Sequence, residues 1–133
     1  MKILRIIILI LLKTSNLLAN SNYFKEGLAF FKKNELDNAK FKFEQDLVFN
    51  PKSEKSYLYL SKIFNAQDKN KLAEKNLNTV ILINPKNEEA LYSLAKIRLK
   101  NSDYEGSKKL IQQLLVFCKD FCEKSKKLKN EIE

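Results

Sequence analysis

Histidine and tryptophan are absent from the 133 residues, and glycine, proline and cysteine occur only twice each. Without histidine the most common general base is missing, and the chain has no glycine-rich phosphate loop. Two cysteines without a histidine do not complete a tetrahedral metal site. So few turn-forming residues also exclude an all-β fold. The sequence therefore predicts a protein that is not an enzyme and holds neither a cofactor nor a metal.

Positive charge exceeds negative charge by nine, and lysine supplies nearly all of it. Only Arg5 and Arg98 break that pattern, and the lysines alternate with glutamate and aspartate along the chain. A nucleic-acid site gathers its basic residues on one face. We therefore expect no nucleic-acid partner, although a nucleic-acid-binding helical repeat stays as a third interpretation.

Residues 1–21 have a different composition from the rest of the chain. A basic start is followed by an apolar run from Ile6 to Leu12, and the small-residue segment Ala19-Asn20-Ser21 fits a cleavage site. The run is shorter than the ~20 apolar residues that span a bilayer. The sequence predicts a signal peptide over 1–21 and an exported, periplasmic protein. The alternative is an uncleaved N-terminal anchor that holds the protein at the inner membrane, facing the periplasm.

Two Asn-Pro pairs, Asn50-Pro51 and Asn84-Pro85, lie 34 residues apart, and each ends a run with helical apolar spacing. A fixed period of this size is typical of a helical repeat, in which each unit covers the apolar face of the next. We predict an all-α, right-handed α-solenoid of three helix pairs over 22–119, approximately 20–53, 54–87 and 88–119, and a capping helix over 120–133.

Polar residues mark where these helices begin. Ser53 and Asn87 stand where a side chain can accept the free N–H groups of a first turn. Ser102 with Glu105, and Asp120 with Glu123, have the spacing of a capping box.

The repeated residues resemble the tetratricopeptide repeat. Small residues recur where that motif places helix crossings, and large ones recur beside them: Gly27, Ser61 and Ala95; Ala39, Ala73 and Ser107; Tyr23, Phe30 and Phe43; Tyr57, Phe64 and Leu77; Leu91, Leu94, Tyr104, Ile111 and Leu114. Four positions depart from the motif, namely Glu26, Asp46, Arg98 and Lys119, the last standing where a third proline would fall. These departures are expected to weaken the first and last units.

The resemblance implies a scaffold for protein–protein interaction, with a concave groove lined by the first helix of each pair. A peptide or partner helix with apolar side chains and acidic flanks would suit its mixture of aromatic, apolar and lysine side chains. The runner-up is a membrane-tethered assembly factor of an envelope complex, for cytochrome maturation, secretion or pili. The groove residues expected on this basis are Phe24, Leu28, Phe31, Lys55, Leu58, Tyr59, Lys62, Asn65, Tyr92, Lys96, Leu99 and Lys100.

One subclass of the family is excluded by the sequence. Members that hold the C-terminal carboxylate of a chaperone use lysine, asparagine and arginine at set groove positions. Those positions here hold Phe24, Leu28, Tyr59, Glu89 and Ser93. None offers a positive charge, and Glu89 would repel a carboxylate.

Cys118 and Cys122 flank the predicted turn before the capping helix. In an oxidising compartment such a pair forms a disulfide, which would pin that helix. Two reduced thiols are the alternative, because bridging these positions within one continuous helix is awkward.

Overall fold

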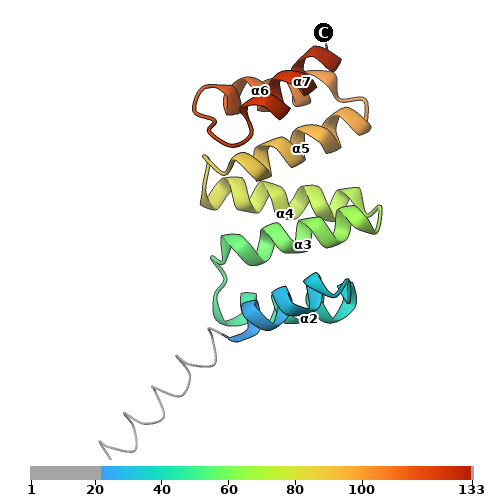
Figure 1. Ribbon diagram of the computed structural model, residues 1–133, viewed down its shortest axis with the longest axis vertical. Coiled ribbons are helices and arrows are strands. Elements are labelled where there is room, and N and C mark those ends of the chain that lie inside the picture. Colours follow the sequence, from blue (N-terminus) through green and yellow to red (C-terminus); the bar gives the residue numbers. More distant parts are fainter. Residues whose placement is uncertain (1–21, 133) are drawn as a thin grey trace, which may run out of the picture. The chain divides into compact units, whose positions relative to one another are not determined.

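A computed structural model describes residues 22–132, so the predicted signal peptide lies outside the described residues. This part of the chain contains helices and no strand, which confirms the all-α prediction. None of its helices combines the length and apolar character needed to cross a membrane. Residues 22–32 are helical, and the helices that follow are α2 (Leu36–Phe49), α3 (Glu54–Ala66), α4 (Asn70–Ile83), α5 (Glu88–Lys100), α6 (Tyr104–Leu115) and α7 (Cys122–Ile132) (Figure 1).

The chain divides into two compact units, and the boundary falls inside α3. The described part of the first unit covers residues 22–56, and the second unit begins at Tyr57. Each unit is described below by itself.

The backbone repeats with the same period as the sequence. Asn34, Asp68 and Ser102 lie 34 residues apart and adopt left-handed backbone angles, with φ of 61°, 55° and 61°. Each residue makes the tight turn inside a helix pair, a conformation that asparagine and aspartate tolerate better than most residues.

The connections between helix pairs also match. The N–H of Asn50 donates to the carbonyl of Asp46, and that of Asn84 donates to the carbonyl of Val80, both at 2.7 Å. Pro51 and Pro85 therefore follow helix ends with the same hydrogen bonding.

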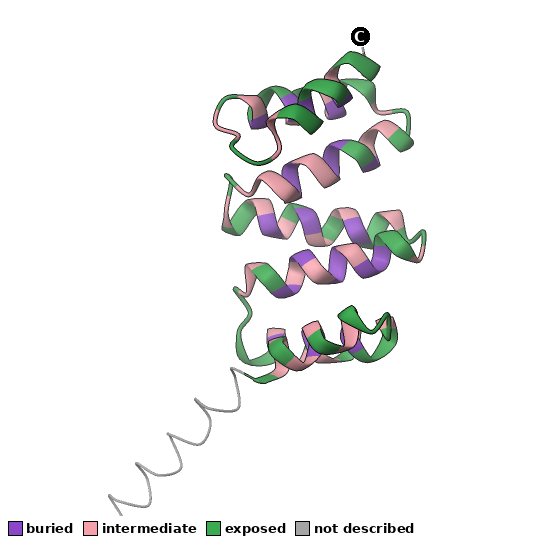
Figure 2. Cartoon of the chain, in the orientation of Figure 1, coloured by how far each residue is buried: buried purple, intermediate pink, exposed green. Residues whose placement is uncertain are grey.

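The second unit is built around α5, which packs against α4, α6 and α7. Ala95, Ile111 and Leu128 form its buried cluster, one residue from each of α5, α6 and α7. Figure 2 shows the buried positions along α5 in purple. Ser107 Oγ donates to the Ala95 carbonyl at 2.9 Å, and both residues are fully buried. A small side chain at each of these positions lets α5 and α6 approach closely, as the repeat pattern predicts.

In the first unit the core residues are Ala39 and Phe43, both fully buried. A Cβ atom added to Gly27 would lie 2.7 Å from Phe43 Cε1, closer than real Cβ contacts allow. The glycine is therefore required by the neighbouring ring and not by its backbone angle. Phe24 packs on the same ring, with the ring centroids 5.6 Å apart.

Polar partners offset three of the four departures from the repeat motif. Glu26 pairs with Lys42 at 2.6 Å. Asp46, only 2% exposed, accepts from Ser56 Oγ at 2.5 Å.

The third departure, Arg98, lies in the second unit. It pairs with Glu74 on α4 and with Asp103 at 2.9 Å. The N–H of Gly106, and then Arg98, lower the pKa of Asp103 below its usual value. We expected these departures from the motif to weaken their units. That expectation did not take the partner side chains into account.

Helix starts agree with the sequence at two positions and differ at two. Ser53 Oγ accepts from the Ser56 N–H at 3.4 Å at the start of α3, as expected of a cap. Asn87 Oδ1 accepts from the Ala90 N–H at 2.8 Å, as expected of a cap. The cap of α6 is Asp103 and not Ser102, because Ser102 occupies the left-handed turn position. α7 begins at Cys122 rather than at 120, because the amides of 119–121 are bound elsewhere.

Candidate functional site

A groove of about 440 Å³ lies within the second unit, between the side chains of α3 and α5, with Leu77 of α4 beneath them. We call it the α3–α5 groove. Leu77 and Ile97 are buried and give it an apolar floor, and three lysines stand along its rim. The lining residues are Ser61, Lys62, Asn65, Asp68, Leu77, Tyr92, Ser93, Lys96, Ile97 and Lys100.

The three groove lysines differ in their partners. Lys62 pairs with Glu89 at 2.8 Å, and its ammonium lies 4.6 Å from the centre of the Tyr59 ring. Lys100 pairs with Asp68 at 2.9 Å. Lys96 lies 6.0 Å from the centre of the Tyr92 ring and makes no ion pair within residues 22–132. Lys96 is therefore the groove cation whose charge is not offset by a neighbouring carboxylate.

Five of the residues expected in the groove line it: Lys62, Asn65, Tyr92, Lys96 and Lys100. Tyr59 lies beside them through its contact with Lys62. That these residues bind a partner stays a prediction.

Other expected groove residues occupy different surroundings. Leu58 is only 9% exposed, and Leu99 packs against the cluster of Ala95, Ile111 and Leu128. Phe24, Leu28 and Phe31 belong to the first unit and are half-buried there; Lys55, also of that unit, is exposed with its ammonium 6.0 Å from the centre of the Phe24 ring. Repeat register alone does not say how deeply a side chain on the inner face lies.

The sequence interpretation did not include Asp68, Leu77 or Ile97 in the groove. Asp68 lies in the turn after α3, and its pairing with Lys100 spans 32 residues. A 34-residue repeat brings such positions together, so a search for opposite charges near one period apart would have found this pair.

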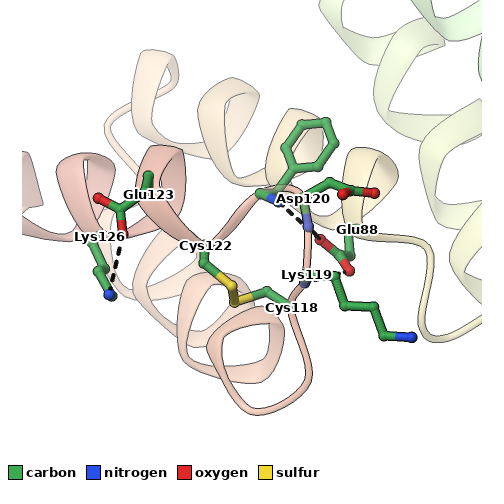
Figure 3. The surroundings of a disulfide bond; sticks show 8 residues. Glu88, Cys118, Lys119, Asp120, Cys122, Glu123 and Lys126 are labelled. Atoms are coloured by element: carbon green, nitrogen blue, oxygen red, sulfur yellow. Dashed lines mark hydrogen bonds and ion pairs between the residues drawn. A yellow bond between two sulfur atoms is a disulfide. The ribbon is translucent and has the colours of Figure 1, made fainter.

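A loop at the end of the second unit is held by one carboxylate. Glu88, at the start of α5, accepts the N–H groups of Lys119 at 2.7 Å and of Asp120 and Phe121 at 2.9 Å each (Figure 3). Lys119 stands where the earlier repeats have proline, and proline has no N–H to donate. The fourth departure from the motif therefore supplies a hydrogen bond that the motif residue would remove.

A disulfide closes the same loop. Cys118 and Cys122 are joined, with their Cα atoms 5.3 Å apart. Cys118 precedes the loop and Cys122 is the first residue of α7, so the two cysteines do not share one continuous helix. This removes the geometric objection to the bridge.

Loop and groove are in contact through aromatic rings. The ring of Phe121 lies 5.4 Å from that of Tyr92, centre to centre, and Tyr92 lines the α3–α5 groove. The three amides that bind Glu88 thus fix the position of a ring next to the groove.

Acidification is expected to open this loop, because protonation of Glu88 removes the negative charge that the three amides bind. Partial desolvation raises the pKa of Glu88, but the amides of Phe121, Lys119 and Asp120 and the charge of Lys119 together lower it below its ordinary 4.5. A lowered pKa means that the contact stabilises the fold above the unfolded-state pKa and is lost as pH falls through the folded-state value. The amide chemical shifts of 119–121 should therefore titrate together below pH 4.5.

Glu88→Gln is the matched control for that titration. It should abolish the shared transition and, at neutral pH, speed amide hydrogen exchange at 119–121 severalfold. Unchanged exchange in Glu88→Gln would contradict the assigned contacts.

Within residues 22–132 no group of three or more cysteine, aspartate or glutamate side chains could hold a metal. The charged groups of the groove are paired across helices or lie over aromatic rings. This arrangement suits recognition of another molecule.

No known family profile and no curated protein sequence matches the chain. Solved structures do match. The Arabidopsis OM64 TPR domain is 18% identical, with a TM-score of 0.79 over 89% of this chain and 97% of that one.

Two peptide-bound structures are also similar. The first TPR domain of Spaghetti (RPAP3), bound to an HSP90 peptide, is 17% identical with a TM-score of 0.76, over 85% of this chain and 89% of that one. The Yersinia enterocolitica type III secretion chaperone SycD, in complex with a peptide of the translocator YopD, is 12% identical with a TM-score of 0.77, over 84% and 90%. At these identities the comparisons show the fold, a helical repeat of the tetratricopeptide type.

Proposed function

We propose that the chain is a non-catalytic scaffold that binds a peptide or a partner helix in the α3–α5 groove. The observation that carries the proposal is the groove itself, with an apolar floor, the Tyr92 ring and the unpaired charge of Lys96. Apolar surface with a few placed polar groups is the usual composition of a peptide site. The partner segment carries an apolar side chain with an acidic residue beside it, and no cofactor or nucleic acid takes part.

Peptide-bound structures of the same fold support this proposal. Spaghetti holds an HSP90 peptide, and SycD holds a peptide of a translocator. The groove here differs from a site for a chaperone's terminal carboxylate, because Glu89 already pairs with Lys62. The proposed ligand is therefore an internal segment of a protein and not a free C-terminus.

The proposed location is the cell envelope, with a periplasmic protein as the first choice. The composition of residues 1–21 supports export, and a disulfide at Cys118 and Cys122 persists in oxidising compartments.

The alternative is a membrane-tethered assembly factor of an envelope complex for cytochrome maturation, secretion or pili, held through an uncleaved segment 1–21. Intact mass of the purified protein separates these proposals. A loss of about 20 residues supports the cleaved form, and the full mass supports the tether.

Peptides selected from a random library on the full-length protein provide the binding test. Lys96→Glu and Tyr59→Glu should each weaken the selected peptides about tenfold. Lys109→Glu is the matched control, because this lysine is exposed on α6, outside the α3–α5 groove. Equal affinities for Lys96→Glu and Lys109→Glu would show that the groove is not the binding site.

A further inference from the structure

Among residues 22–132, the three most exposed large hydrophobic side chains share one position of the repeat. Val48, Leu82 and Val116 are 77%, 83% and 85% exposed, and they lie 34 residues apart. Val48 and Leu82 are in the last turns of α2 and α4, and Val116 directly follows α6. Single exposed apolar residues are common on protein surfaces, but a repeat of the same exposed position three times calls for an explanation.

A second apolar residue follows each of these residues directly, and a lysine lies three or four residues after each of them. Phe49 is 50% exposed, Ile83 is 36% exposed and Phe117 is half-buried. We call these helix ends the apolar tips: Val48, Phe49 and Lys52; Leu82, Ile83 and Lys86; Val116, Phe117 and Lys119.

Each apolar tip carries one lysine, with acidic residues nearby. Lys52, Lys86 and Lys119 are all exposed. The exposed acidic neighbours are Glu44, one turn before Val48, and Asp120, after Lys119. Glu54, Glu88 and Glu89 also lie near the tips, but Glu88 binds the 119–121 amides and Glu89 pairs with Lys62.

Two of the tips lie at the same end of the second unit. Glu88, which begins the helix after the α4 tip, binds the amides of the loop after the α6 tip. The connections after α4 and after α6 accordingly lie on the same side of this unit (Figure 1). One flat surface can therefore contact both tips together.

In the first unit the tip lies where the chain enters the described residues. The ring of Tyr23 stacks on that of Phe49, with centroids 5.5 Å apart. The preceding sequence carries the apolar run from Ile6 to Leu12. A membrane that receives this run is within reach of the α2 tip, because only about ten residues separate them.

We propose that the apolar tips dock the protein on an anionic lipid bilayer. Apolar side chains enter the boundary between headgroups and acyl chains, and neighbouring lysines attract the negative surface. The contact is separate from the α3–α5 groove and does not depend on what that groove binds. It adds a membrane surface in the folded repeats to any contact made through residues 1–21.

The absence of tryptophan from the chain allows a direct test on the full-length protein. Single tryptophans are placed at two tips, Leu82→Trp and Val116→Trp. The matched control is Tyr104→Trp, which is 54% exposed at the opposite end of α6 from Val116. Quenching by brominated lipid is then measured in vesicles of phosphatidylcholine and phosphatidylglycerol in equal parts, and in phosphatidylcholine alone.

Both tip tryptophans should shift to shorter wavelength and be quenched severalfold more than the control in the anionic vesicles. Adding Lys86→Glu to Leu82→Trp should weaken this response roughly fivefold or more. Equal quenching at all three positions would overturn the proposal, because a chain held only through residues 1–21 gives that result. A blue shift that appears without vesicles and grows with protein concentration would also overturn it, in favour of a second copy of the chain.

Discussion

Truncating Ile111 to alanine is expected to lower the free energy of unfolding by about 2–5 kcal/mol. Ile111 is fully buried and joins Ala95 of α5 to Leu128 of α7. Removing its outer carbons leaves a cavity at the centre of the second unit, which neighbouring helices fill only in part. Urea unfolding followed by far-UV circular dichroism measures the loss.

Val116→Ala is the control for this truncation. It removes apolar carbons near the end of the same helix from a side chain that is 85% exposed. Its effect should stay within about 0.5 kcal/mol. If both substitutions cost the same, Ile111 is not part of the packed core described here.

Replacing Ser56 by alanine is expected to destabilise the first unit by about 2–3 kcal/mol. The Ser56 hydroxyl donates to the buried Asp46 carboxylate, and its removal leaves an acceptor without its donor in the protein interior. One period further on, the equivalent residues are Val80 and Ala90, both fully buried.

The double variant Asp46→Val with Ser56→Ala copies that apolar pair. It should recover most of the loss, because replacing both members of a buried polar pair costs much less than removing one. A double-mutant cycle, with amide hydrogen exchange of residues 36–49 as the readout, measures the coupling. Additive effects would contradict a direct Asp46–Ser56 interaction.

The period of the fold is visible in the sequence because proline and small residues act locally. Pro51 and Pro85 stop a helix wherever they occur, and Ala39 and Ala73 are small whatever surrounds them. An all-α helical repeat could therefore be predicted from the sequence. The exact starts of its helices could not, since Asp103 and the 119–121 amides take their roles from turn geometry.

Contacts between residues far apart in the sequence could not be predicted in this way. Lys42 compensates Glu26, and Glu88 binds amides 31 to 33 residues away. Periodicity identifies which residues share a face of a helix, and Lys62, Tyr92 and Lys96, which share such a face, line one groove of the second unit. It gives no depth, and Leu58 was consequently expected in a groove although it is buried.

The amide of Lys119 limits how this array can be engineered. A design that restores the consensus proline at this position would delete a donor to Glu88 and loosen the segment carrying Phe121. A consensus sequence of the repeats would thus place proline at position 119, where the backbone N–H is needed as a donor to Glu88. Any fourth repeat added after Leu115 would also have to replace the three N–H donors that Glu88 loses.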